Sequence, residues 1–337
     1  MRNARLEDWL NTEVIGKVAS CASFAVGTQE FVWQFAAGTL SYESVAECTA
    51  ETRFDVASLT KVVATTPAAM LLFESGALDL HEPTEPFGAT PFQLLTHSSG
   101  LPPYRDCTSL GLKPNDLRKE LGKTPFVYVP GSEVQYSCIG IIQLQTLIEK
   151  ITGQNLNNLL DDRLWGPLGM DDTGYLPNSP ESCAATEQTK PWRSEPGAYS
   201  QGRVHDPLAY LLGGISGNAG VFSTASDLAR FCRWYLSDSD AVVGANTRKD
   251  WAKKRISTRA LGWDTKSETG SSAGEKFSPS SFGHTGYTGT SIWIDPERGC
   301  FAVLLTNRVH PNDDNLEPFK LLRPRFHDLV IDELDRA

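Results

Sequence analysis

The sequence of 337 residues predicts a mixed α/β (α+β) fold. In this fold, one antiparallel sheet is built from both ends of the chain and is flanked by helices. Strand-like runs occur near the two termini, at 23–36 and 290–306, whereas the middle of the chain has helical periodicity. A chain of this length also exceeds what one hydrophobic core fills, which favours two lobes. We therefore expect a sheet lobe from residues 1–57 and 241–337, an inserted, mainly helical lobe from 58–240, and an active site between them.

The N-terminal region is expected to form a short amphipathic helix over residues 6–18, followed by a β-hairpin. The strands of the hairpin are the runs 23–27 and 30–36, which are joined by a Gly-Thr-Gln turn. A long apolar stretch over residues 58–72 then predicts a helix. Pro67 falls inside it and should bend or loosen it.

Cap signals locate helices of the inserted lobe. Thr90, Pro91 and Gln93 form a helix-start signature, and Thr224 with Asp227 forms a capping box. After these, we expect mostly loop over 101–130, helices over 136–151 and 156–165, and a surface excursion over 177–204. Close glycine packing is expected over 213–220. The chain should end with a second hairpin, from strands 290–294 and 300–306, and a last helix over 316–334.

Charge and cysteine content exclude several classes of protein. The net charge of −10 argues against binding to nucleic acid or to anionic membranes, and no stretch approaches 18 apolar residues, so no membrane span is expected. The seven cysteines are scattered and lack C-x-x-C spacing, which fits free thiols in a reducing compartment. With no signal peptide at the N-terminus, a cytoplasmic protein is expected. No obligate protein partner is evident.

The chemistry is organised around residues 54–61, which contain the only S-x-x-K of the chain, Ser58 and Lys61. A spacing of three places both side chains on one helix face. An alcohol is a poor nucleophile until a base takes its proton, and a neutral lysine amine can do so. Burial and the positive end of a helix starting near Ser58 would keep Lys61 neutral for part of the time. The same helix end places backbone N–H groups where an oxyanion would form.

Alone, this motif is a weak signal, because a chain of this length is expected to contain one by chance and the usual interpretation is an exposed helix face, so its partners decide. The first is Tyr136, at the start of a predicted helix, where a phenol could relay protons to a leaving group. The second is the glycine-rich stretch 283–289, a strand edge along which a substrate could lie and which could supply a second oxyanion donor. Its His284 could orient or protonate the substrate. The plainer interpretations are a tyrosine that packs at a helix end and a glycine-rich bend.

These three boxes, in this order and spacing, resemble the serine β-lactamase and penicillin-recognising D-alanyl peptidase superfamily. The likeness is greatest to its class C-like branch, which includes β-lactamase-fold carboxylesterases. The segments that carry it are 54–61, 94–102, 136–153, 164–170, 219–229 and 284–289. The resemblance covers roughly residues 10–335 and implies a β-lactamase/transpeptidase-like fold.

The resemblance also implies residue roles. Ser58 would be the acylated nucleophile, Lys61 its base and Tyr136 the second proton carrier. The backbone N–H groups of Ser58 and Tyr287 would form the oxyanion hole. Which group acts as the base in acylation is disputed for the related class A lactamases, and the resemblance does not decide it.

Two positions depart from the family pattern. Cys138 stands where the second box usually ends in Asn, whose amide contacts the substrate. His284, followed by Thr285 and Gly286 at the substrate edge, stands where the third box often has Lys. Imidazole is only partly charged near neutral pH. Both changes should weaken recognition of a β-lactam or D-alanyl carboxylate without removing the acylating groups.

Several other patterns could indicate a different catalytic or binding site. Residues 270–274 match the G-x-S-x-G elbow but lack the strand and helix that the elbow needs, so a loop is expected. The neighbours His205 and Asp206 suggest a triad, but adjacent residues rarely face each other correctly. The six histidines lack metal-binding spacing, and neither a metal nor another cofactor is expected. Trp192, Trp263 and Tyr287 are candidates for the pocket wall.

Three functions remain open. The leading one is a serine hydrolase that forms an acyl-enzyme on Ser58 and hydrolyses small esters or amides. The second is a D-alanyl-D-alanine carboxypeptidase or a weak class C-like β-lactamase, acting on a peptide or lactam. The third is a catalytically silent binding or scaffold protein with a lactamase fold, which the intact set of Ser58, Lys61 and Tyr136 argues against.

Overall fold

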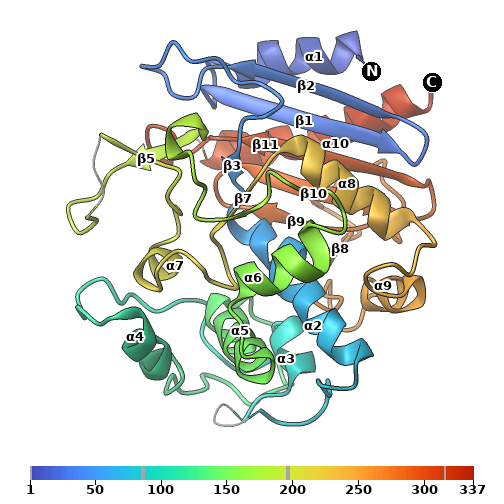
Figure 1. The fold of residues 1–337 in the computed structure, drawn as a ribbon. Coiled ribbons are helices and arrows are strands. Elements are labelled where there is room, and N and C mark those ends of the chain that lie inside the picture. The colour runs from blue at the N-terminus through green and yellow to red at the C-terminus, as the bar shows by residue number, and fades with distance from the viewer. Residues whose placement is uncertain (1, 85–87, 195–197, 315) are drawn as a thin grey trace.

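The computed structural model describes residues 2–84, 88–194, 198–314 and 316–337, and its centre is a six-stranded antiparallel sheet (Figure 1). The strand order is β2-β1-β11-β10-β9-β8. The strands are β1 Cys21–Thr28, β2 Val32–Gly38, β8 Asp264–Thr265, β9 Phe282–Gly286, β10 Thr290–Asp295 and β11 Cys300–Thr306. Because β1 pairs directly with β11, the expectation of one sheet built from both chain ends is confirmed.

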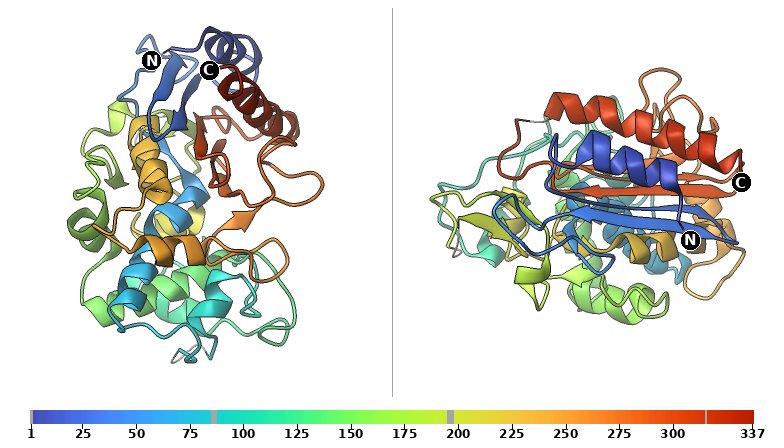
Figure 2. Two further views of the ribbon diagram at one scale, coloured as in Figure 1. Left: turned by 90° about the vertical axis from the view of Figure 1, so that its right-hand side faces the viewer. Right: turned by 90° about the horizontal axis from the view of Figure 1, so that it is seen from above.

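One face of the sheet is covered by the two terminal helices, α1 (Ala4–Trp9) and α10 (Leu316–Leu334), which lie side by side (Figure 2). Their contact includes the rings of Trp9 and Phe326, whose centroids are 5.2 Å apart. Alternation along β1 sends Phe24 into this layer and Ala25 into the larger core on the other face.

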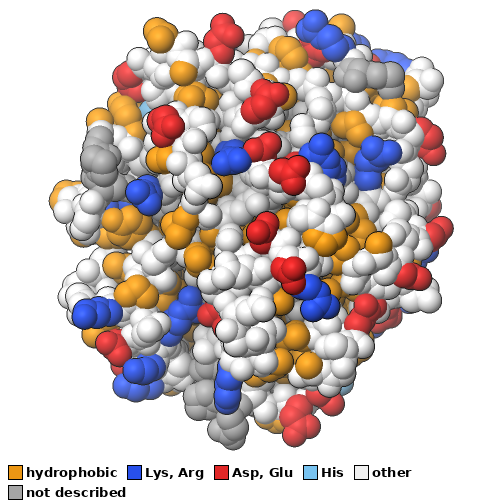
Figure 3. Space-filling view, in the orientation of Figure 1, with side chains coloured by type: hydrophobic (Ala, Val, Ile, Leu, Met, Phe, Trp, Pro, Cys, Tyr) orange, Lys and Arg blue, Asp and Glu red, His pale blue; other side chains and the backbone are white. Residues whose placement is uncertain are grey.

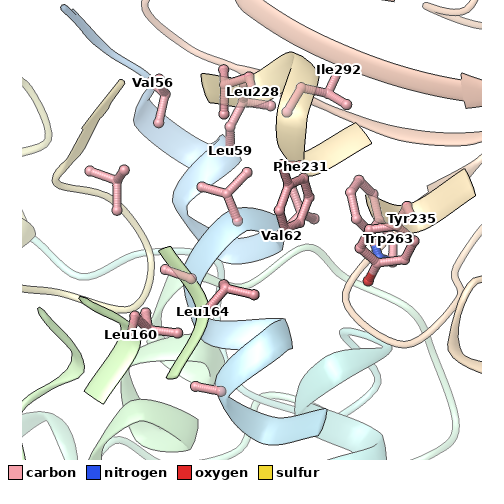
Figure 4. Packing of buried hydrophobic residues seen from close by; sticks show 14 of the residues in the cluster. Val56, Leu59, Val62, Leu160, Leu164, Leu228, Phe231, Tyr235, Trp263 and Ile292 are labelled. Atoms are coloured by element: carbon pink, nitrogen blue, oxygen red, sulfur yellow. The ribbon is translucent and has the colours of Figure 1, made fainter. Parts of the chain in front are cut away.

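The other face packs against the helical segment that carries Ser58 and against α8 (Ala225–Leu236). The Ser58 segment is continuous but irregular: a 3₁₀ turn at Ala57–Leu59, a π-helical turn at Lys61–Thr65, and then α2, Thr66–Glu74. Its apolar side chains, among them Leu59 and Val62, pack with Phe231 of α8 and Ile292 of β10 (Figure 4). The irregular turns precede Pro67, where the sequence predicts loosening.

The remaining elements form the helical part and three small strand pairings. The helices are α3 Pro91–Leu95, α4 Pro114–Leu121, α5 Cys138–Thr152, α6 Leu156–Leu160 with a π turn at Asp161–Trp165, α7 Pro207–Leu211 and α9 Ala245–Trp251; the strands are β3 Phe54–Asp55, β4 Gly174–Tyr175 and β7 Val221–Ser223 in one sheet, and β5 Ala185–Gln188 with β6 Tyr199–Gln201 in another.

Most predicted elements are confirmed, including both hairpins, the Thr90 capping box and the last helix. The cap at Thr224 is one-sided: its side chain accepts the Asp227 N–H, but the Asp227 carboxylate instead receives the N–H of Asp172 and the Thr173 hydroxyl. The close glycine packing is confirmed at Gly217, where a Cβ would come within 2.9 Å of Thr65 Oγ1.

Three expectations were wrong in part. The first helix ends at Val14 in a π turn, four residues early. The region predicted as mostly loop over 101–130 contains α4, whose only buried side chains, Leu117 and Leu121, make too narrow an apolar stripe for periodicity to reveal. The surface excursion over 177–204 contains β5 and β6 and buries several side chains; its residues 195–197 lie outside the described ranges.

The proposed lobe boundaries stay a prediction. Among the described residues, no helix is long and apolar enough to pass through a bilayer. Acidic and basic side chains are interspersed over the face shown in Figure 3, without a large patch of one sign.

Candidate active site

Ser58 and Lys61 lie one turn apart at the start of the irregular helix. Lys61 Nζ lies 3.1 Å from Ser58 Oγ and donates to it. The Lys61 side chain is completely buried, whereas Ser58 is half-buried and lines a cavity. The π turn that begins at Lys61 is a common feature of functional sites, because it re-aims side chains within a helix.

The ammonium of Lys61 has a second acceptor, the main-chain carbonyl oxygen of Asn218, at 2.7 Å. Burial by itself lowers the pKa of Lys61, but Cys138 and Tyr136 raise it, and the balance lies above the usual value. The expectation that Lys61 is partly neutral at rest is therefore not met. The two acceptors, Ser58 Oγ and the Asn218 carbonyl oxygen, are placed to stabilise an ammonium ion.

Tyr136 was predicted to begin a helix, but α5 begins at Cys138 with Ser137 as its N-cap, so Tyr136 lies two residues before the helix. Its ring centroid is 4.9 Å from Lys61 Nζ. The hydroxyl is buried and has no hydrogen-bond partner among the described residues. Burial raises the pKa of Tyr136, and the nearby Lys61 and Ser58 only partly offset that rise. A phenol held without a partner beside a serine and an ammonium ion is free to exchange a proton with them.

The third box forms β9 and the turn that follows it, and it is clamped to the segment just before Ser58. Thr288 Oγ1 donates to the carbonyl oxygen of Asp55 at 2.7 Å, and Thr290 Oγ1 donates to that of Val56 at 3.0 Å. A Cβ on Gly286 would lie 2.0 Å from Thr290 Oγ1 and 2.5 Å from the Val56 carbonyl oxygen, so only glycine fits. Ala57, beside this contact, has φ +48°, a left-handed conformation that is strained for alanine.

His284 lies on β9 with its ring buried. Its Nδ1 is 2.9 Å from the carbonyl oxygen of Thr285, which can only accept, so Nδ1 carries the proton and Nε2 is an acceptor. Burial, with Lys61 and Arg259 nearby, lowers the pKa of His284 to about 3. The imidazole is therefore neutral near neutral pH and is not the counterpart of the cation that the family often has here.

The cavity in front of Ser58 has a volume of about 390 Å³. It is lined by Ser58, Tyr136, Arg259, Asp264, His284, Thr285, Gly286, Tyr287, Leu316, Lys320 and Arg323. The structure thus brings together most of the residues that the sequence singled out. Of the three pocket-wall candidates only Tyr287 lines it, because Trp263 lies in the core and Trp192 packs on Tyr210. Cavities of about 570 and 700 Å³ elsewhere contain none of the predicted site residues.

Sequence reasoning missed the cations of this cavity. Arg259 is paired with Asp264 at 3.7 Å, and Lys320 with Glu317 at 2.8 Å. Arg323, on α10, donates to the carbonyl oxygen of Gly286 at 2.8 Å, and its Nε has no hydrogen-bond partner among the described residues. Their segments show no motif, and only the tertiary fold brings them to the cavity.

Asn218 and Cys138 lie close to Lys61 but are not among the residues that line the cavity. Asn218 Oδ1 accepts from Ser216 Oγ at 2.7 Å, whereas Nδ2 is buried and unpartnered among the described residues. Burial raises the pKa of the Cys138 thiol, which Lys61 partly opposes, so the thiol is neutral near neutral pH. The glycine-dense sequence around Asn218 was the available signal for this second acceptor of Lys61, and it indicated only close packing.

The rival motifs do not form sites. Residues 270–274 are turns without a preceding strand or following helix. The ring of His205 stacks on that of Tyr287, with centroids 5.7 Å apart, whereas the side chain of Asp206 caps α7, so the two side chains make separate contacts.

Comparison with known proteins agrees with this geometry. The family model described as Beta-lactamase matches residues 11–323. The chain is 30% identical to a protein of Escherichia coli K12 named as a D-alanyl-D-alanine carboxypeptidase, over 81% of this chain and 73% of that protein. It is 31% identical to the N-acetylmuramyl-L-alanine amidase of Bacillus subtilis, over 77% of this chain and 68% of that one.

Solved structures share the fold at lower identity. EstCE1, a hydrolase with promiscuous acyltransferase activity, superposes with a TM-score of 0.79 at 19% identity, covering 97% of this chain and 98% of its own. Simvastatin synthase from Aspergillus terreus superposes with a TM-score of 0.76 at 18% identity, covering 99% and 98%. The predicted β-lactamase/transpeptidase-like fold is thereby confirmed.

Replacing Gly286 by alanine tests the clamp between β9 and the Ser58 segment. The added Cβ must displace Thr290 Oγ1 and the Val56 carbonyl, so we expect a loss of about 1–3 kcal/mol in the free energy of unfolding. We also expect roughly 100-fold slower labelling of Ser58 by a fluorophosphonate, because its helix start moves. The matched control is Gly140→Ala, whose Cβ would come no closer than 3.4 Å to any atom. Wild-type labelling in Gly286→Ala would contradict the clamp.

Proposed function

The chain belongs to the beta-lactamase family, and on that premise we propose that it is a hydrolase that forms an acyl-enzyme on Ser58 and cleaves small esters or amides. The observation that carries the proposal is the 3.1 Å contact between Lys61 Nζ and Ser58 Oγ, with the lysine fully buried and the serine at the cavity wall. A buried lysine bonded to a serine hydroxyl at a cavity wall is the arrangement that activates an alcohol.

Acylation starts from a form of the site that has lost one proton from Lys61 or Tyr136. Ser58 Oγ attacks the substrate carbonyl carbon, and its proton passes to the deprotonated member of this pair. The negative charge that forms on the carbonyl oxygen is stabilised by the backbone N–H groups of Ser58 and Tyr287. As the tetrahedral intermediate collapses, the carbonyl carbon's bond to the leaving oxygen or nitrogen breaks, and Tyr136 supplies the leaving group with a proton.

Deacylation repeats these transfers with water as the nucleophile. Water gives one proton to the same pair, its oxygen bonds to the acyl carbon, and Ser58 leaves with that proton. His284 Nε2 is an acceptor at the cavity wall and is suited to hold the water or a substrate N–H, but as a neutral ring it does not act as an acid.

The cavity supports a substrate whose leaving side carries a negative charge. Arg323 has no carboxylate partner among the described residues, and although burial, with Arg308 close by, lowers its pKa to about 9, it stays charged at neutral pH. This observation, with the relatives named as carboxypeptidases, favours a D-alanyl-D-alanine peptide as the second candidate substrate. The departures at Cys138 and His284 weigh toward simpler esters and amides.

We also propose a cytoplasmic location. All seven cysteines lie in the described part of the chain and none forms a disulfide, which supports a reducing compartment.

Intact-protein mass spectrometry of the wild type beside Ser58→Ala tests the nucleophile and the substrate together. Each protein is mixed separately with a short-chain aryl ester, a penicillin and a D-alanyl-D-alanine peptide, and released product is measured. We expect ester turnover by the wild type, no lasting penicillin adduct, and neither turnover nor adduct in Ser58→Ala. Release of D-alanine or a stable penicillin adduct would move the substrate to the peptidase class. Turnover by Ser58→Ala would overturn the mechanism.

The pH dependence of kcat/KM tests which groups carry the proton. The pKa values of Lys61 and Tyr136 are both raised, and the active form lacks one of their protons, so activity should rise from pH 6 to pH 9, by up to about tenfold per unit. His284 is already neutral over this range, so His284→Asn should keep the shape of the profile. If the plot of kcat/KM against pH shows a transition with a midpoint near pH 6.5, and that transition disappears in His284→Asn, the assignment of the proton to Lys61 and Tyr136 is contradicted.

A further inference from the structure

The turn over residues 96–102 belongs to none of the three boxes, yet it contains a strained and buried histidine. His97 has φ +55°, which few residues other than glycine adopt, and its side chain is buried. Strain of this kind persists where the surrounding structure fixes it, and it concentrates near functional sites.

Besides bonds to Leu94 and to the Tyr128 hydroxyl, His97 makes three contacts with the segment that carries Tyr136. Its Nδ1 accepts the backbone N–H of Ser137 at 3.2 Å, and its carbonyl oxygen accepts that of Gln135 at 2.9 Å. Its ring packs on the ring of Tyr136, with centroids 4.6 Å apart. The two residues that flank Tyr136 are therefore bonded to the same histidine that touches its ring.

We propose that His97 is a positioning residue, which fixes Tyr136 beside Ser58 and Lys61 through the Ser137 N–H bond and ring contact. This inference rests on the proposed function, since the placement of Tyr136 matters only if Tyr136 carries a proton. The Tyr136 ring also contacts that of His284, with centroids 5.8 Å apart.

The bond to Ser137 requires a neutral imidazole, because a protonated Nδ1 cannot accept. The surroundings provide this: burial, together with the cations Arg259 and Lys61, lowers the pKa of His97 well below its usual value. With Nδ1 accepting, the ring proton is on Nε2, which is buried and has no hydrogen-bond partner among the described residues. A histidine that served only to satisfy the core would have both ring nitrogens bonded.

The test compares three replacements of His97. Asparagine places Oδ1 where Nδ1 was and tolerates a positive φ, so His97→Asn keeps the acceptor but loses the ring. Glutamine places its polar atoms one bond further out, and glycine relieves the strain without any acceptor. We expect kcat to fall roughly 100-fold in His97→Gln and His97→Gly, with KM little changed, and to stay within about tenfold of the wild type in His97→Asn.

A double-mutant cycle with Tyr136→Phe separates positioning from general destabilisation. If His97 acts through the Tyr136 hydroxyl, His97→Gln should lower kcat by no more than about threefold in the Tyr136→Phe background, because the group it positions is already gone. Thermal unfolding is measured for every variant. If His97→Gln does not fold, His97→Asn takes its place in the cycle, and its smaller effect on kcat must then disappear in the Tyr136→Phe background.

Each outcome has a distinct meaning. Equal kcat in His97→Gly and the wild type, or an unchanged effect of His97→Gln in the Tyr136→Phe background, would overturn the positioning role. If Ser58→Ala or Tyr136→Phe retains full activity, the proposed function fails first. If both of those variants lose activity while His97→Gln does not, only the present inference fails.

Discussion

The site is governed by the burial of one positive charge, that of Lys61. An ammonium ion removed from water is strongly unfavourable unless oxygens surround it. Here the acceptors are Ser58 Oγ, on its own helix, and the carbonyl oxygen of Asn218, far along the chain. The requirement for that carbonyl explains the glycine-dense loop: Gly217 lies so close to Thr65 and Ile141 that a Cβ would be within about 3 Å of both. Thr65 Oγ1 also donates to the carbonyl oxygen of Gly217, which ties the loop to the Lys61 helix.

The start of this helix is held from two sides. On one side β3 pairs with β7, and the Val221 N–H donates to Thr60 Oγ1 at 3.1 Å. On the other side the hydroxyls of Thr288 and Thr290 hold the carbonyls of residues 55 and 56. The strained backbone of Ala57 lies between these two attachments. Because the attachments come from distant parts of the sequence, the position of Ser58 depends on the complete fold and not on its local helix.

Sequence alone was informative where the physics is local. Capping residues, alternating strands and the S-x-x-K spacing depend on neighbours within a few positions, and the elements they predict are present. The misses are of two kinds. Helix α4 contacts the core through only two leucines, which is too weak a pattern to detect. Arg259, Asn218 and Arg323 reach the site through tertiary contacts that no short motif encodes.

Electrostatics could not be read from residue types either. His284 was expected to be partly charged, but a ring buried beside Lys61 and Arg259 is neutral. Lys61 was expected to be partly neutral, but its pKa lies above the usual value, and two oxygen acceptors, one of them far along the chain, surround its amine. In both cases the residue type was identified correctly, whereas its protonation followed from burial and from neighbours distant in sequence.

The C-terminal helix α10 shows how closely the fold and the site are joined. Its apolar side chains, such as Phe326, cover the sheet, while Arg323, a turn earlier, donates to the carbonyl oxygen of Gly286 on β9. The end of β9 at Gly286 is therefore attached both to the segment that carries Ser58 and to this helix. Since His284 is neutral, the positive charges of the cavity are those of Arg259, which is paired with Asp264, and of Lys320 and Arg323 on α10. We expect that replacing residues of α10 would alter the charge of the cavity without changing Ser58, Lys61 or Tyr136.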